Sequence, residues 1–102
     1  MRVSLHPDAA QDLFEAAAFY EREVSRALAA RFVTEFKRVA SLLASQPDIG
    51  ASRSRGRRGL AMNVFPYTVI YRVTEDELKI LVVKHDRRRP GYGGSRSLGH
   101  KN

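Results

Sequence analysis

The chain has 102 residues, which suits a single domain, and 43% of them are hydrophobic, enough for a small core. It has no cysteine, which excludes disulfides and thiolate metal sites, and no apolar stretch approaches the roughly 20 residues that cross a bilayer. Eighteen Lys and Arg residues against eleven Asp and Glu residues give a net charge of +7. The N-terminus has no apolar signal-peptide core, so we expect a cytoplasmic protein.

The first half of the sequence predicts a short strand and two helices. Residues 2 to 5 alternate in polarity, as a strand does. Pro7 suits the first turn of a helix, because the proline nitrogen lacks a hydrogen that would be unpaired there anyway. Apolar residues then recur at helical spacing from 8 to 24 and from 25 to 43, with Ser25 as a candidate N-cap. These segments predict a helical hairpin.

The second half predicts strands. Pro47 and Gly50 end the second predicted helix, residues 51 to 59 form a polar, arginine-rich loop, and residues 60 to 64 predict a strand. Residues 67 to 74 and 78 to 83 are rich in β-branched and aromatic side chains, and a short acidic connection between them predicts a β-hairpin.

The element order β-α-α-β-β-β predicts an α+β fold. We expect the two-helix hairpin to pack on a small antiparallel sheet of about four strands, since each amphipathic helix needs one face covered. Residues 1–92 form the predicted domain. Residues 93–102, rich in glycine and serine, form a predicted flexible tail.

Basic residues gather in two stretches, whereas acidic residues are concentrated in the first half of the chain. This asymmetry indicates a polyanionic partner, either a nucleic acid or an acidic protein. The first stretch lies in the Gly/Ser loop and is a candidate contact for such a partner. It contains Arg53, Arg55, Arg57 and Arg58.

The second stretch follows the predicted hairpin, which would hold it in a fixed position. Its candidate functional residues are Lys84, His85, Arg87, Arg88, Arg89 and Tyr92. RNA cleavage by 2′-hydroxyl attack requires a base, an acid and positive charge on the phosphate, and these side chains can supply all three. The alternatives are a structural histidine bonded to backbone or to Asp86, a tyrosine that packs against the helices, and a solvated arginine loop.

The histidines do not indicate a metal site. His6, His85 and His100 have no metal-ligand spacing, and His6 is expected to be structural at the junction between strand and helix. No glycine-rich phosphate loop lies between a strand and a helix. We therefore predict no metal and no cofactor.

An ordered set of short motifs extends over nearly the whole chain. It consists of His6-Pro7, Phe19-Tyr20-Glu21, Pro47 with Gly50, Phe65-Pro66-Tyr67, Ile70-Tyr71-Arg72-Val73, and His85 with Arg88, Pro90, Gly91 and Tyr92. In this order and spacing, the set resembles the RelE/ParE superfamily of type II toxin–antitoxin toxins. The resemblance implies a small cytoplasmic bacterial toxin and a cognate antitoxin whose tail wraps and blocks it.

The resemblance implies one of two mechanisms, because the superfamily has two broad branches. RelE-like members cut mRNA in the ribosome, whereas ParE-like members poison DNA gyrase without cutting nucleic acid. Residues 60 to 64 lack the RelE-type lysine pair, and Thr68 stands where those relatives have an arginine. The chain therefore resembles the ParE side more.

Three functions remain open from the sequence. In the favoured one, Lys84, Arg87, Arg88, Arg89 and Tyr92 contact gyrase, and the arginines of residues 53–58 contact the antitoxin or another polyanion. The alternative is a ribosome-dependent mRNA endonuclease, with His85, Arg87, Arg88 and Tyr92 as catalytic candidates. A further alternative is a non-toxic, basic nucleic-acid-binding module. Whether the chain is an enzyme stays open, although the missing RelE-type residues favour a protein that is not.

Overall fold

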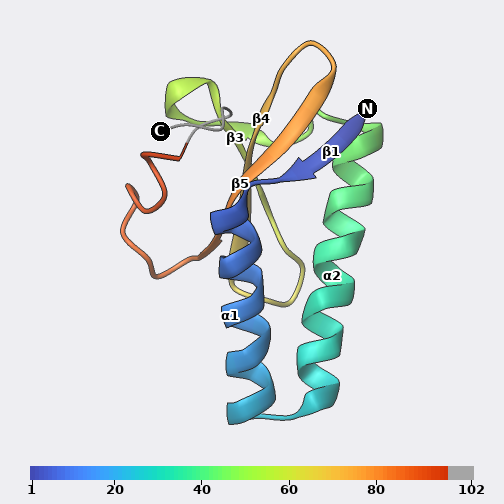
Figure 1. The fold of residues 1–102 in the computed structure, drawn as a ribbon, viewed down its shortest axis with the longest axis vertical. Coiled ribbons are helices and arrows are strands. Elements are labelled where there is room, and N and C mark those ends of the chain that lie inside the picture. Colours follow the sequence, from blue (N-terminus) through green and yellow to red (C-terminus); the bar gives the residue numbers. More distant parts are fainter. Residues whose placement is uncertain (97–102) are drawn as a thin grey trace.

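The structure is a computed structural model and describes residues 1–96. Within this part of the chain, two helices stand side by side as an antiparallel pair, next to a sheet of five strands (Figure 1). The elements are β1 (Arg2–Leu5), α1 (Pro7–Glu23), α2 (Arg26–Ser45), β2 (Ala51–Ser52), β3 (Arg58–Ala61), β4 (Tyr67–Val73) and β5 (Glu77–His85). Neither helix is long and apolar enough to cross a membrane.

Both helices begin where the sequence predicts, at capping side chains. His6 is the N-cap of α1, and its Nδ1 accepts a hydrogen bond from the backbone N–H of Asp8 at 3.0 Å. Ser25 caps α2, and its Oγ accepts from the N–H of Leu28 at 3.0 Å. Each cap satisfies a backbone donor that the first helical turn leaves unpaired. The structural role expected for His6 is confirmed.

The strand order is β1-β5-β4-β3-β2, and β4 and β5 form the predicted antiparallel hairpin. Two details differ from the prediction. The sheet is mixed, because β1 pairs parallel with β5 after the helical hairpin has carried the chain back across the sheet. The fifth strand is β2, a two-residue segment that pairs with β3 at the far edge.

The third strand, β3, lies earlier in the chain than predicted. The sequence predicted a strand over residues 60 to 64, whereas β3 spans Arg58–Ala61. Val64 has a φ of 72°, in the left-handed region, and is therefore outside strand geometry. The N–H of Phe65 bonds to the carbonyl of Asn63 at 2.7 Å, so the chain turns here before it enters β4.

The helices cover the sheet face that carries Tyr67, Val69 and Tyr71, a choice that the sequence left open. Aromatic rings dominate this core. The ring of Phe32 lies 5.0 Å from that of Tyr67 and 5.2 Å from that of Phe65. Tyr71 is fully buried, and its hydroxyl donates to the carbonyl of Pro47 at 2.8 Å.

A β-bulge gives the other face of the sheet a small apolar cluster of its own. The register shifts between Ile70 and Tyr71, which pair with Val82 and Ile80, so Leu81 is the extra residue of β5. Ile70, Leu81 and Val82 form a second buried cluster, and Tyr92 packs against it. The segment after β5 is therefore anchored to the sheet face that the helices leave uncovered.

Candidate functional site

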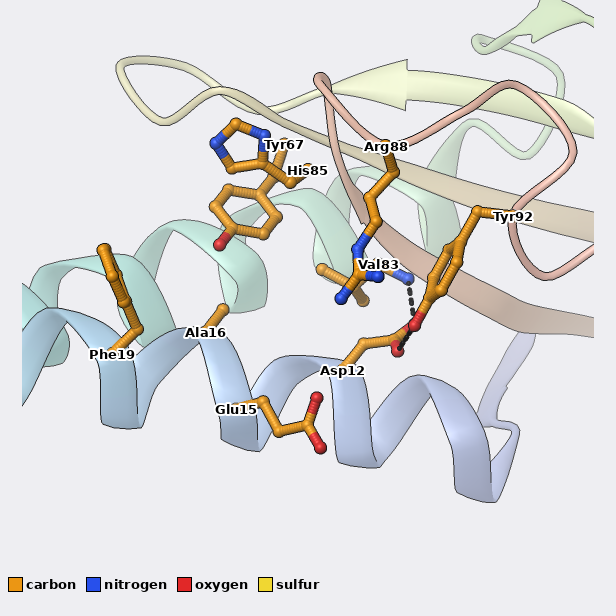
Figure 2. Close-up of a pocket in the computed structure, with 9 residues that line it drawn as sticks. All are labelled: Asp12, Glu15, Ala16, Phe19, Tyr67, Val83, His85, Arg88 and Tyr92. Atoms are coloured by element: carbon orange, nitrogen blue, oxygen red, sulfur yellow. Dashed lines mark hydrogen bonds between the residues drawn. The ribbon is translucent and has the colours of Figure 1, made fainter.

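An open pocket of about 330 Å³ lies between α1 and the end of β5 (Figure 2). Side chains of α1 form its floor, and residues of β4, β5 and the following segment form the opposite wall. The lining residues are Asp12, Glu15, Ala16, Phe19, Tyr67, Val83, His85, Arg88 and Tyr92. Three of the residues predicted from the sequence, His85, Arg88 and Tyr92, thus share one pocket.

The pocket forms where β5 has no neighbouring strand. β1 pairs only with the first half of β5, from Glu77 to Ile80. Beyond that point side chains satisfy the strand edge: Asp12 Oδ2 accepts from the N–H of Val83 at 3.0 Å, and Arg96 Nη1 donates to the carbonyl of Leu81 at 3.0 Å. These two bonds pair groups that a free edge would leave open to another strand.

Asp12 is the centre of the polar network beside the pocket. It is buried, and it accepts hydrogen bonds from the Tyr92 hydroxyl at 2.9 Å and from Arg96 Nη1 at 2.6 Å. Burial by itself lowers the pKa of Arg96, but the hydrogen bond and the charge of Asp12 outweigh it, so the pKa is raised. The hydrogen-bonded pair of Asp12 and Arg96 fixes the position of the Tyr92 hydroxyl.

Tyr92 is held by its ring as well as by its hydroxyl. The guanidinium carbon of Arg88 lies 4.5 Å from the ring centroid, and that of Arg96 lies 5.1 Å away. Both contacts are in the range of cation–π interactions. Because the hydroxyl already donates to Asp12, Tyr92 acts in this structure as a support for Arg88 rather than as an unengaged proton donor.

His85 lies at the other end of the pocket, against Tyr67 (Figure 2). The two rings meet edge to face with 5.0 Å between their centroids. His85 Nδ1 accepts from the backbone N–H of Arg87 at 3.0 Å, so this nitrogen is already engaged. The contact matches the structural alternative of a histidine bonded to backbone at a strand end.

The remaining residues predicted in this stretch lie outside the pocket. Arg87 and Arg89 are exposed, whereas Lys84 is only 8% exposed and pairs with Thr68 within the hairpin. Lys84 therefore presents little surface to a macromolecular partner.

The arginines of residues 53–58 are separate from this pocket. Arg53, Arg55 and Arg57 line a smaller pocket next to Ile70. Arg58 donates to the carbonyl of Gly50 at 2.9 Å and lies 3.9 Å from the carboxylate of Asp48. Within residues 1–96, no group of three or more His, Asp or Glu side chains lies close enough to hold a metal ion. The expected absence of a metal or cofactor stays a prediction.

Sequence reasoning missed Asp12 and Arg96 as site residues. A signal for Asp12 was present, because position 12 falls on the same helical stripe as Ala9 and Ala16, both of which are buried. A carboxylate on a buried stripe requires a cationic partner. Arg96 gave no such signal, since it lies in the expected tail. The structure describes residues 93 to 96 in contact with the domain, and residues 97–102 lie outside the described part.

This fold, with a two-helix hairpin on one sheet face and a basic segment after the last strand, is that of a RelE/ParE-superfamily toxin. A family model described as the ParE toxin of the type II toxin–antitoxin system parDE matches residues 3–90. The chain therefore belongs to the ParE toxin family, as its motifs predicted.

A solved structure, the chromosomal ParDE toxin–antitoxin system from P. aeruginosa, has the same fold. It matches with a TM-score of 0.73 and 24% sequence identity, over 83% of this chain and 95% of that chain. Among curated proteins, none matches this sequence significantly.

Proposed function

We propose that this toxin acts in the cytoplasm by contact with DNA gyrase rather than by cutting RNA, and that a cognate antitoxin neutralises it. One observation favours contact with a target over cleavage of RNA. The Tyr92 hydroxyl, one of the two best acid–base candidates, already donates to Asp12, and the other candidate, His85, is engaged at Nδ1 by the backbone N–H of Arg87, which leaves His85 Nε2 to exchange a proton. RNA cleavage needs both a base and an acid, so one available imidazole nitrogen supplies only half of that chemistry.

The proposed target-binding surface is the exposed arginine segment Arg87–Arg89. It directly follows β5, and the N–H of Arg88 bonds to the carbonyl of His85 at 2.9 Å, so the segment continues from a fixed strand end. Arg88 also lies over the ring of Tyr92, which Asp12 holds. A positive surface with a fixed position favours recognition of an acidic partner through electrostatic complementarity.

The proposed antitoxin-binding surface is the outer side of the helical hairpin and the turn before β4. Large apolar side chains are exposed there, with Phe14 at 67% and Val64 at 82%. A pocket of about 310 Å³ beside Val64 is also lined by Arg31 and Arg38. An amphipathic segment with acidic residues would cover the apolar groups and pair with the arginines.

Gyrase supercoiling and transcript 5′-end mapping together test the proposed target. The purified chain should inhibit supercoiling and leave ribosome-bound mRNA intact. Replacing Arg87, Arg88 and Arg89 by alanine should abolish inhibition and toxicity. The matched control replaces three exposed basic residues of α2 by alanine (Arg26, Arg31 and Lys37), removes the same charge, and should keep both activities.

Two results would overturn the proposal. Codon-linked mRNA cleavage that disappears in Tyr92→Phe or His85→Ala would place the chain among the ribosome-dependent endonucleases. Nucleic-acid binding without growth inhibition, in a host that lacks the antitoxin, would place it among non-toxic binding modules. The antitoxin proposal is tested separately, by co-purification with the product of the adjacent gene.

A further inference from the structure

A second basic site lies on the sheet face that the helices do not cover. It is a pocket of about 180 Å³ between the loop before β3 and the turn that contains Tyr92. Its lining includes Arg53, Arg55 and Arg57, the apolar side chain of Ile70, and Gly94. Tyr92 lines this pocket too, but the arginines of the proposed gyrase contact, Arg87–Arg89, do not.

The loop backbone places these arginines side by side. Arg55 and Gly56 both have left-handed backbone angles, with φ values of 64° and 70°, so the loop reverses direction there. The side chain of Arg53 crosses the sheet above Gly59, where an added Cβ would lie 2.9 Å from Arg53 Cδ. The N–H of Arg53 bonds to the carbonyl of Arg57 at 2.8 Å and closes the loop.

Backbone carbonyls of the C-terminal segment hold two of the arginines. Arg57 donates to the carbonyl of Gly93 at 3.2 Å and to that of Arg96 at 2.6 Å. Arg55 donates to the carbonyl of Gly94. These contacts fix the guanidinium groups without neutralising them, because a carbonyl carries no net charge.

Positive charge at this pocket is therefore uncompensated. Among the ion pairs of residues 1–96, none joins Arg53, Arg55, Arg57 or Arg72 to a carboxylate. Burial lowers the pKa of Arg57, and the charges of Arg72, Arg55, Arg96 and Arg53 lower it further. Proteins rarely bury a cation beside other cations without an anion to balance them.

Hydrogen-bonding capacity is also unused. Arg57 is only 8% exposed, and its Nε has no hydrogen-bond partner among the described residues. The Nε of Arg72, whose Nη2 donates to the carbonyl of Arg55, has none either. A buried donor without a partner is destabilising, and an anion with several acceptor oxygens would supply one.

We propose that this pocket binds a phosphate group, either as free phosphate or as the terminal phosphate of a nucleotide. Phosphate presents several charged acceptor oxygens, which suits a pocket lined by three arginines. The volume of about 180 Å³ is several times the roughly 30 Å³ of one water. It holds a phosphate group, whereas an attached nucleoside would extend outside.

A titration of the ¹⁵N-labelled chain with inorganic phosphate, followed by NMR at constant ionic strength, tests the proposal. The amides of residues 53–57 and 91–94 should shift in a saturable way, and those of the exposed segment Arg87–Arg89 should not. The double variant Arg53→Gln and Arg55→Gln should bind phosphate at least about tenfold more weakly, since it removes two charge-assisted donors. The matched control, Arg26→Gln and Lys37→Gln on exposed positions of α2, should bind as the unchanged chain does.

A second measurement, the change in Tm on adding phosphate, checks whether the substitutions act by altering the loop rather than by removing contacts to phosphate. Phosphate should raise the Tm of the unchanged chain and of the control variant more than that of the pocket variant, because a ligand specific to the folded state stabilises it. The variants are essential here, since phosphate also stabilises proteins without binding them. A parallel titration with AMP distinguishes the two sources: binding of phosphate alone indicates the free ion, and binding of AMP at the same amides indicates a nucleotide.

Two results would overturn the proposal. One is a set of phosphate-induced shifts spread equally over all basic segments. The other is equal phosphate affinity in the unchanged chain and the pocket variant.

Discussion

The two faces of the sheet are covered in different ways. On one face, α1 and α2 bury a continuous core in which Phe32 and Tyr71 are fully enclosed. On the other, the apolar cluster consists of only Ile70, Leu81 and Val82, and a loop and the C-terminal segment lie over it. The first cover is hydrophobic, whereas arginine side chains bonded to backbone carbonyls hold much of the second.

The difference between the two covers separates residues that stabilise the fold from residues whose charges stay available to ligands. Burial of large side chains provides most of the free energy of folding, so the helix face should dominate stability. A cover held by charged hydrogen bonds contributes less net free energy and keeps its cations available to ligands. The four predictions below test this division, from the largest expected effect to the smallest.

The largest loss should follow Phe32→Ala. The ring is fully buried and contacts three other aromatic rings, so its removal leaves a cavity on the helix face. We expect a loss of about 3–5 kcal/mol in the free energy of unfolding, measured by urea denaturation. Phe14→Ala, at a side chain 67% exposed on α1, is the control and should change it by less than about 1 kcal/mol.

Asp12→Ala should destabilise by about 3 kcal/mol. The substitution leaves Arg96 without its buried partner and the N–H of Val83 without an acceptor. Hydrogen exchange at the Val83 amide should become faster, which a general loss of packing would not confine to that site. Asp8→Ala is the control, because the Asp8 carboxylate is 62% exposed and 3.7 Å from Arg96. Equal effects of the two substitutions would contradict the central role of Asp12.

Arg57→Ala should destabilise by only about 1 kcal/mol, despite the burial of the side chain. The hydrogen bonds to the carbonyls of Gly93 and Arg96 are lost, but so is the repulsion from the neighbouring arginines. Hydrogen exchange should accelerate from Gly93 to Arg96 and not in α1 or α2. A loss as large as that of Phe32→Ala would mean that both faces contribute equally to stability.

The smallest effect should follow Glu35→Gln. The hydrogen bond from Arg38 lowers the pKa of Glu35, and burial opposes it. A lowered folded-state pKa stabilises the protein above the unfolded-state value of 4.5, and this contribution is lost as the pH falls through the folded-state pKa. Glu35→Gln should therefore flatten the decline of stability in acid, by less than about 1 kcal/mol because Arg38 is 45% exposed. Glu21→Gln, at a carboxylate 55% exposed, removes the same charge and serves as the control.

Local patterns were sufficient to predict the helices and the hairpin. The apolar stripes, Pro7 and the Ser25 cap specify helix starts through neighbours a few residues away, and the β-branched segments specify β4 and β5 in the same way. The parallel pairing of β1 was not predicted, because it depends on where the helical hairpin returns the chain.

The site was less predictable, since its contacts join distant parts of the sequence. Tyr92 and Arg88 were named as candidates from composition, but nothing local indicates that Asp12 holds Tyr92. Likewise, nothing local indicates that carbonyls of Gly93 and Arg96 hold the guanidinium group of Arg57. A glycine at position 93 is itself required by this packing, because an added Cβ would lie 2.6 Å from Val82 Cγ2.

The Asp12–Arg96 pair also affects the order in which parts of the structure form during synthesis. The two residues are 84 positions apart, so the contact closes only after Arg96 has left the ribosome. At about 5–20 residues per second, several seconds separate the appearance of α1 from that of Arg96. During this interval Asp12 has no buried cation to pair with, and its side of α1 cannot dock on β5 without a desolvation penalty. The helical hairpin can therefore form early, whereas the arrangement of Tyr92 and Arg88 is completed only after Arg96 has been made.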